Sequence, residues 1–247
     1  MSNTAPILTL NNIEVIYDKV ALAIKGVSVE VPQGGMVALL GANGAGKSTT
    51  LKSISGLLQP ERGEVTRGDI RFMGQDIAGL APQARVKLGI VQVLEGRRVF
   101  EHLTPDENLV AASAVVGGSR ADMNRHRDMV YAYFPRLHQR RTAQSGFLSG
   151  GEQQMLAIGR ILRTGANLLL LDEITEGLAP VIVQTLGRVI RALKAKGLTI
   201  ILVEQNFRFA APLADRHYVM EHGQIVATVA KNELESKADM LREYLGV

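Results

Sequence analysis

The sequence predicts an α/β fold built on a parallel sheet, and two stretches of the chain carry this prediction. The apolar run MVALL (36–40) enters a glycine-rich loop, and helical spacing follows in STTLKSISGLL (48–58). Later, strand-like LLLLD (168–172), the helical pattern VIVQTLGRVIRALKAKG and strand-like LTIILVEQ follow one another. Strands that alternate with helices are typical of a parallel sheet, and ligands bind at the carboxyl ends of such strands.

The other segments have patterns of their own. ILTLNNIEVIY and VSVEV near the N-terminus have β-type patterns, and ERGEVTRGDIRFMGQDI (61–77) is typical of a hairpin. From about residue 105 to 165 the pattern is helical, with helix starts predicted at Thr104 and Ser149. The last segment, ELESKADMLREYL, predicts a short amphipathic helix packed on the core. The 247 residues hold no repeat or low-complexity linker, so we expect one domain with an inserted lobe.

The composition limits the class of protein. Hydrophobic residues make up 46% and charged residues 21%, which is typical of a globular protein with a large core. No apolar run reaches the roughly 18 to 20 residues that cross a bilayer, and the start MSNTAPILTL predicts no secretory signal. The chain has no cysteine, which excludes disulfides and thiolate metal sites and fits the cytoplasm.

The net charge of +4 is compatible with nucleic acid, anionic lipid or phosphate ligands. The densest basic cluster, residues 119–141, alternates with apolar positions. Solvated helix faces are therefore its first interpretation, and a binding patch is the second. Aromatic residues make up only 4% of the chain, which is poor for a surface that stacks bases. We expect no nucleic-acid partner.

The loop GANGAGKS (41–48) fits the pattern of a phosphate-binding loop. Its glycines let the backbone curl so that N–H groups face one point, and the start of the next helix adds partial positive charge there. Lys47 can reach the β- and γ-phosphates, and Ser48 can ligate Mg²⁺. The alternative is a glycine-rich turn with an accidental Lys-Ser. It does not account for the apolar strand before the loop and the helical pattern after it.

The run LLLLDE (168–173) ends an apolar strand with two carboxylates. If this strand lies beside the phosphate-binding loop, Asp172 can hold Mg²⁺ directly or through water. Glu173, one residue later, can orient and deprotonate the water that attacks a γ-phosphate. A solvated Asp-Glu pair at a strand end is the alternative, and it would be preferred without the phosphate-binding loop.

The segment LSGGEQQ (148–154) opens a helix with Ser149 and two glycines, which is a second helix start suited to an anion. A capped helix with no ligand is the alternative. A second phosphate sensor far from the only Lys-bearing loop indicates that it serves the nucleotide of a partner molecule.

In this order, GANGAGKST, LSGGEQQ and LLLLDE resemble the nucleotide-binding subunit of ATP-binding-cassette transporters, over nearly the whole chain. Within that family, VLEGRRVF (93–100), LTPDENL (103–109), EGLAP (176–180) and ILVEQN (201–206) resemble the LivF-type ATPase subunit of branched-chain amino acid importers. The resemblance implies a RecA-like, P-loop NTPase core with an N-terminal antiparallel β subdomain and an inserted α-helical subdomain.

The implied boundaries are a core with its β lobe over about 6–95 and 165–230, a helical subdomain over about 96–164, and a C-terminal helix over about 231–246. Two subunits would sandwich two ATPs head to tail, so that the loop of one faces Ser149 of the other. The implied nucleotide contacts are Tyr17, Gly41, Asn43, Gly44, Ala45, Gly46, Lys47, Ser48, Thr49, Ser149, Gly150 and Gly151. Tyr17 either stacks on adenine or packs on the β lobe.

The resemblance also implies a catalytic set of Glu173, Gln205 and Lys47 and a metal set of Ser48, Glu95 and Asp172. Glu95 stands where the lobe-linking loop usually carries Gln, and Gln92 is the competing candidate for that position. Arg97, Arg98 and Phe100 follow it. They either lie near the groove that receives a helix of the membrane subunit or are exposed loop residues.

Three further positions depart from the common cassette pattern. Gln205 replaces a His that contacts the γ-phosphate, and since a Gln amide carries no positive charge, we expect impaired hydrolysis. Ile174 replaces Pro after Glu173, which relaxes the backbone there. Glu152 stands where Gln is more common.

The implied function is ATP binding and hydrolysis at the cytoplasmic face of the cell membrane, energising uptake of branched-chain or related hydrophobic amino acids. The implied partners are a LivG-type ATPase subunit, or a second copy of this chain, two permease subunits and, indirectly, a solute-binding protein. Urea, aromatic acids or amides are alternative solutes. A nucleotide-dependent interaction switch that scarcely hydrolyses ATP is the alternative of another class. DNA-repair and translation cassettes are excluded because the chain has neither a coiled-coil insertion nor a second cassette.

Overall fold

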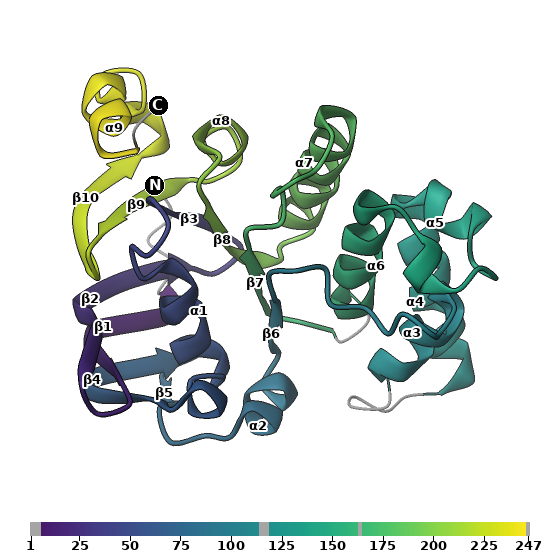
Figure 1. The fold of residues 1–247 in the computed structure, drawn as a ribbon, viewed down its shortest axis with the longest axis horizontal. Coiled ribbons are helices and arrows are strands. Elements are labelled where there is room, and N and C mark those ends of the chain that lie inside the picture. Colours follow the sequence, from purple (N-terminus) through teal and green to yellow (C-terminus); the bar gives the residue numbers. More distant parts are fainter. Residues whose placement is uncertain (1–5, 114–118, 163–164, 246–247) are drawn as a thin grey trace.

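The computed structural model describes residues 6–113, 119–162 and 165–245, which form two sheets and a group of helices (Figure 1). The first sheet is antiparallel, with its strands in the order β2-β1-β4-β5. Its strands are β1 (Pro6–Tyr17), β2 (Ala21–Pro32), β4 (Gly63–Phe72) and β5 (Gln75–Asp76). The β2 strand begins well before the VSVEV segment, and β4 with β5 forms the hairpin expected in residues 61–77.

The second sheet has six strands in the order β10-β9-β3-β8-β7-β6, and all its neighbours are parallel except β10 with β9. Its strands are β3 (Met36–Leu40), β6 (Ile90–Val93), β7 (Leu168–Asp172), β8 (Thr199–Glu204), β9 (Arg216–Glu221) and β10 (Gln224–Ala230). In the register, Leu40 pairs with Glu204 and Asp172 with Val203. The carboxyl ends of β3, β7 and β8 therefore meet at one edge.

Apolar residues along the central strands are buried on both faces of this sheet. In β3, Met36, Ala38 and Leu40 belong to the core beneath the helices, whereas Val37 and Leu39 belong to the core between the two sheets. The β7 leucines divide between the two cores in the same alternating way. Two buried faces explain why these strands are continuous apolar runs rather than alternating ones.

The helices fall into two groups. Those close to the sheets are α1 (Lys47–Ser55), η1 (Gln59–Glu61), α2 (Pro82–Lys87), α7 (Pro180–Ala195), α8 (Phe207–Ala210), η3 (Lys231–Glu233) and α9 (Ala238–Leu245). The others gather beside the six-stranded sheet, away from the antiparallel one (Figure 1). They are α3 (Pro105–Ser113), α4 (Arg120–Tyr133), α5 (Pro135–Gln139), η2 (Ser145–Phe147) and α6 (Gly150–Leu162). This architecture confirms the predicted fold class.

Side-chain caps define the two predicted helix starts in this group. Thr104 and Glu107 exchange hydrogen bonds at the start of α3, and Ser149 and Glu152 do the same before α6. Each pair forms a capping box that satisfies amide groups which the helix leaves unpaired. Glu152 therefore holds the turn that carries Ser149.

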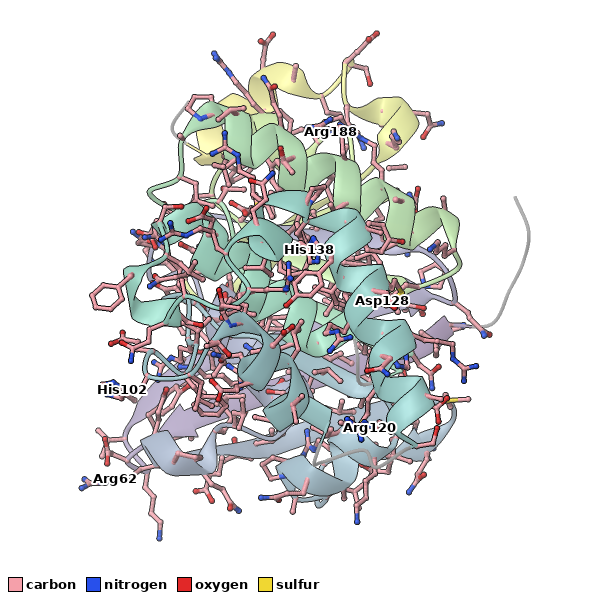
Figure 2. The ribbon with its side chains drawn as sticks, turned by 90° about the vertical axis from the view of Figure 1, so that its right-hand side faces the viewer. Arg62, His102, Arg120, Asp128, His138 and Arg188 are labelled. Carbon is pink, nitrogen blue, oxygen red and sulfur yellow. The ribbon has the colours of Figure 1, made fainter. Side chains whose placement is uncertain are left out.

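The basic segment 119–141 forms α4 and α5, and its charged side chains lie mostly on the exposed face, as Arg120 and Asp128 do in Figure 2.

Helix α9 begins at Ala238, later than the predicted 231, because residues 231–233 form a separate 3-10 turn and Ser236 donates a hydrogen bond to the Glu233 carbonyl. Residues 163–164 and 246, at the ends of predicted helices, lie outside the described residues. None of the helices in the described part of the chain has the length and apolar character needed to cross a bilayer.

Candidate functional site

The loop between β3 and α1 turns sharply at two glycines. A Cβ at Gly41 would collide with the carbonyl oxygen of Met220, and Gly46, which precedes α1, has a φ of 102° that favours glycine. Within the loop, the Ala45 N–H donates to the Ala42 carbonyl at 3.2 Å, which closes a tight turn. The backbone N–H groups at the start of α1 are thereby left to face an anion.

A pocket of about 550 Å³ opens over this loop. Its lining combines the loop with the start of β2 and with the edge where the parallel strands end: Leu22, Ala23, Lys25, Asn43, Gly44, Gly46, Lys47, Ser48, Thr49, Glu95, Glu173, Glu176 and His222. Three carboxylates therefore share the pocket with Lys25, Lys47 and the helix start. Glu95, Glu173 and Glu176 can bring oxygens within 4.8 Å of one another.

Lys47 lies at the centre of the pocket and is only 4% exposed. Its Nζ lies 3.0 Å from Glu173 Oε1 and donates to the Ala42 carbonyl oxygen at 3.0 Å. A phosphate bound by the loop would compete with Glu173 for this ammonium group. Glu173 would then lose its cationic partner and face the phosphate.

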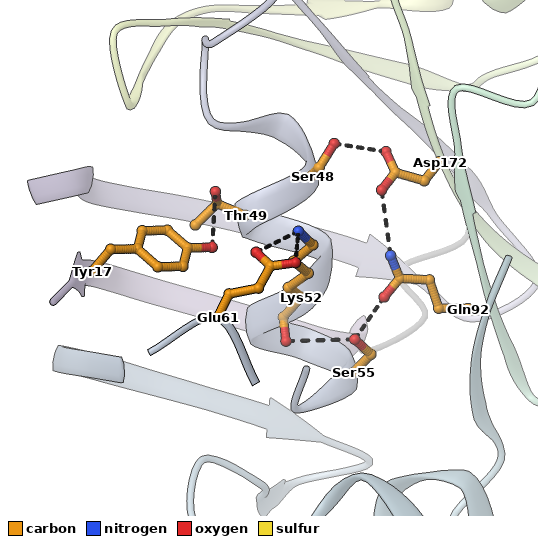
Figure 3. Close-up of polar contacts among 8 residues, drawn as sticks. All are labelled: Tyr17, Ser48, Thr49, Lys52, Ser55, Glu61, Gln92 and Asp172. Atoms are coloured by element: carbon orange, nitrogen blue, oxygen red, sulfur yellow. Dashed lines mark hydrogen bonds and ion pairs between the residues drawn. The ribbon is translucent and has the colours of Figure 1, made fainter. Parts of the chain in front are cut away.

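Asp172 is held by side chains from α1 and β6 (Figure 3). Ser48 Oγ donates to Oδ1 at 2.9 Å, and Gln92 Nε2 donates to Oδ2 at 3.4 Å. Gln92 in turn accepts a hydrogen bond of 2.6 Å from Ser55. Burial raises the pKa of Asp172 to about 6, although the Ser48 hydrogen bond lowers it. A serine hydroxyl and a carboxylate at one point are the hard oxygen ligands that Mg²⁺ prefers.

Glu173 has a left-handed backbone, with a φ of 43°, at the end of β7. Its N–H donates to the Val203 carbonyl of β8 at 3.0 Å. Gln205, which follows β8, donates through Nε2 to Glu173 Oε2 at 2.9 Å and to Asn43 Oδ1 at 2.5 Å. Gln205 therefore joins Glu173 to the phosphate-binding loop.

Tyr17 and Glu95 come from different elements, since Tyr17 ends β1 and Glu95 follows β6. The Tyr17 ring packs against Gly63, and its hydroxyl lies 3.4 Å from Thr49 Oγ1 (Figure 3). Among the described residues, the pocket lining includes Glu95 but neither Tyr17 nor Gln92. Gln92, the competing candidate for the lobe-linking position, is hydrogen-bonded to Asp172 and Ser55. This geometry favours Glu95 as the residue that faces a ligand.

The helix start at Ser149 lies on α6, and none of residues 149–151 lines the pocket over Lys47. Ala45, the remaining predicted loop contact, is buried. The loop and Ser149 of one chain therefore do not surround the same pocket. This separation is what a site shared between two chains requires.

Arg97 has a role that the sequence did not indicate. Its Nη2 donates to the carbonyls of Glu176 and Gly177 at 3.0 and 3.2 Å, and the guanidinium leaves no room for a Cβ at Gly150. Arg97 thus ties together the lobe-linking loop, the segment after Glu173 and the start of α6. The spacing of these segments in the chain gives no sign of the contact.

Arg98 and Phe100 point elsewhere. Arg98 lines an apolar groove of about 310 Å³ between β6 and α6, and its carbonyl accepts a hydrogen bond from Arg160. The Arg160 guanidinium lies 4.3 Å from the centre of the Phe100 ring, which is 48% exposed. These two residues are therefore placed beside a groove, whereas the half-buried Arg97 is bonded to the segment after Glu173.

Glu204, at the end of β8, is a second residue that the sequence did not indicate. Its side chain is buried, and burial raises its pKa to about 7, although hydrogen bonds from Thr175 lower it. The folded protein thus binds this proton more tightly than the unfolded chain, whose Glu titrates near 4.5. The stability that this group contributes is present below pH 4.5 and is lost as the pH rises through about 7.

We expect Glu204→Gln to remove this part of the pH dependence. Urea unfolding at pH 5 and pH 8 measures the free energy of unfolding of both proteins. From pH 5 to pH 8 this free energy should fall by up to about 3 kcal/mol more in the wild type than in the variant. Equal losses in both proteins would contradict the assignment to Glu204.

Known proteins resemble the chain over most of its length. The family model described as "ABC transporter" matches residues 24–176. A high-affinity branched-chain amino acid transport ATP-binding protein, BraG of Pseudomonas aeruginosa, is 43% identical over 97% of this chain and 99% of its own. A probable branched-chain amino acid transport ATP-binding protein, LivF of Archaeoglobus fulgidus, is 36% identical over 84% and 86%. The crystal structure of a nucleotide-free ATP-binding cassette from an ABC transporter superposes with a TM-score of 0.84, at 26% identity, over 98% and 99%.

Proposed function

The chain belongs to the ABC transporter family as an ATP-binding subunit, and from this premise we propose that it drives an importer of branched-chain or related hydrophobic amino acids. The observation that carries the ATPase assignment is the contact of Lys47 with Glu173 over the phosphate-binding loop. A cation for phosphate and a carboxylate for water meet there. The solute assignment rests on the likeness to BraG and LivF.

The residues of the pocket fit a triphosphate and its metal ion. The loop 41–49 would surround the phosphates, and Lys47 would exchange Glu173 for the β- and γ-phosphates. Ser48 and Asp172 would hold Mg²⁺, with Glu95 close by, because its carboxylate can come within 4.8 Å of that of Glu173. When bound, the ion would neutralise the charge that develops on the phosphates. Tyr17, beside Thr49, would border the adenine end.

Glu173 is the general base of the proposed reaction. Once Lys47 turns to the phosphates, its carboxylate is free to accept a proton from the attacking water. Gln205 orients that carboxylate and offers its amide to the γ-phosphate. Because the amide is neutral, it stabilises the transferred phosphoryl group less than an imidazolium would.

A second ATPase chain completes each site in this proposal. Ser149, Gly150 and Gly151 would meet the γ-phosphate held by the partner's loop, and the partner is a LivG-type subunit or a second copy of this chain. Two permeases would receive the closing motion at the cytoplasmic face of the membrane, with the groove beside Arg98 and Phe100 as the contact. A solute-binding protein would deliver the solute on the other side.

Uptake measurements test the function as a whole. Cells that lack this chain should recover uptake of labelled leucine when given the wild type but not when given Lys47→Ala. Recovery of urea or amide uptake, with leucine uptake unchanged, would support the alternative solutes instead. Normal uptake with Lys47→Ala would refute the ATPase role.

The neutral Gln205 favours a second candidate, a nucleotide-dependent switch with little hydrolysis. We expect Gln205→His to raise the kcat of the isolated chain at least about tenfold, because a charge-assisted contact to the phosphoryl group is gained. Phosphate release by wild type, Gln205→His and Gln205→Ala measures this effect. If wild type and Gln205→His hydrolyse ATP equally fast, Gln205 does not limit the site.

A further inference from the structure

The turn that carries Glu173 is attached at three points to β8 and to the residue that follows it. The Glu173 N–H bonds the Val203 carbonyl, and the Glu173 carboxylate bonds Gln205. The third attachment lies beyond Glu173: the Thr175 N–H donates to Glu204 Oε1 at 3.2 Å, and its hydroxyl donates to Oε2 at 2.8 Å. Both oxygens of Glu204 are thus used by one residue.

This third attachment is buried. Glu204 is 2% exposed and Thr175 is 7% exposed, so water does not compete for their hydrogen bonds. In the described part of the chain, the donors to Glu204 are Thr175 and the N–H of Asn206, and neither carries a positive charge. A buried carboxylate without a cation is costly, so it calls for a role that an apolar residue could not fill.

The local backbone explains why such an attachment is needed. Glu173 has a left-handed conformation, with a φ of 43°, which a residue with a Cβ keeps only when its surroundings enforce it. Ile174 follows where a proline would have fixed the backbone. The hydrogen bonds that Thr175 donates to Glu204 of β8 restrain the backbone after Ile174 instead.

We propose that Glu204 is a positioning residue that holds Thr175, and through it the left-handed turn that directs the Glu173 carboxylate toward the attacking water. This inference rests on the proposed role of Glu173 as base. In this proposal Glu204 acts only through Thr175, which donates to both of its oxygens.

The test compares the same substitution at the two ends of β8. Thr175→Val removes the hydroxyl that Glu204 holds, whereas Thr199→Val removes a buried hydroxyl that accepts from the Gly34 N–H at the opposite end. Thr175→Ser keeps the hydroxyl and is the conservative variant. Each full-length chain is assayed for kcat and KM with MgATP and for ATP affinity by calorimetry.

We expect Thr175→Val to lower kcat at least about tenfold, with KM and ATP affinity within about threefold, since a small displacement of a catalytic group costs rate rather than binding. Thr175→Ser should restore the rate, and Thr199→Val should keep it. Adding Glu204→Gln to a Thr175→Val chain should lower kcat little further, because both changes disturb the same contact between Glu204 and Thr175. An unchanged kcat in Thr175→Val, an equal loss in Thr199→Val, or no rescue by Ser would overturn the proposal.

Glu173→Gln in the same assay separates this inference from the proposed function. If Glu173→Gln abolishes turnover while Thr175→Val does not, only the positioning role of Glu204 fails. If Glu173→Gln keeps full turnover, the proposed base is wrong, and the positioning role falls with it.

Discussion

Glu173→Gln should lower the kcat for ATP hydrolysis by about 10²- to 10⁴-fold, which is the usual contribution of a general base. The amide has nearly the same shape but cannot accept a proton from water. It also removes the negative charge that pairs with Lys47 at 3.0 Å, so ATP no longer has to displace an anion from the lysine. Affinity for ATP should therefore be unchanged or higher, as calorimetry with the full chain can measure.

Glu176→Gln is the matched control. Glu176 lines the same pocket three residues later, but its side chain is exposed, and Lys47 and Gln205 are bonded to Glu173 instead. We expect the control to keep kcat within about threefold, as for most substitutions of exposed groups without a specific partner. A similar loss in both variants would mean that the acidic pocket as a whole, rather than one carboxylate, supports hydrolysis.

Local patterns were sufficient to predict the fold class and the phosphate-binding loop. MVALL and LLLLD are continuous apolar runs because both faces of their strands are buried, and the glycines and Lys47 follow one of them directly. Helix starts such as Ser149 are also local, since cap and partner lie three residues apart. Interactions of this kind are visible in a short stretch of sequence.

The contacts that tune the site were not predictable in this way. Gln92 meets Asp172, and Glu204 meets Thr175, across 80 and 29 residues of chain. Such pairs depend on strand order and register, which neither hydrophobic periodicity nor composition specifies. Arg97 is a similar case, because its carbonyl partners lie about eighty residues away and are backbone groups of no particular sequence.

Mixing two inactive variants should restore hydrolysis if two chains share each site. Lys47→Ala removes the cation for phosphate, while Ser149→Asp places a negative charge opposite the γ-phosphate. Alone, each variant inactivates both sites of a head-to-tail dimer. A mixed dimer contains one inactive site and one site with intact Lys47 and Ser149. Since about half of the dimers in an equal mixture are mixed, the mixture should recover up to about a quarter of wild-type turnover.

The geometry of the pocket makes this the more demanding test of the proposed function. Residues 149–151 do not line the pocket over Lys47 in the described part of one chain, so rescue needs contact between chains. The double variant, Lys47→Ala with Ser149→Asp on one chain, is the control, because mixing it with either single variant rebuilds no complete site. Rescue by this control, or full activity of Ser149→Asp alone, would show that hydrolysis does not need Lys47 of one chain together with Ser149 of another.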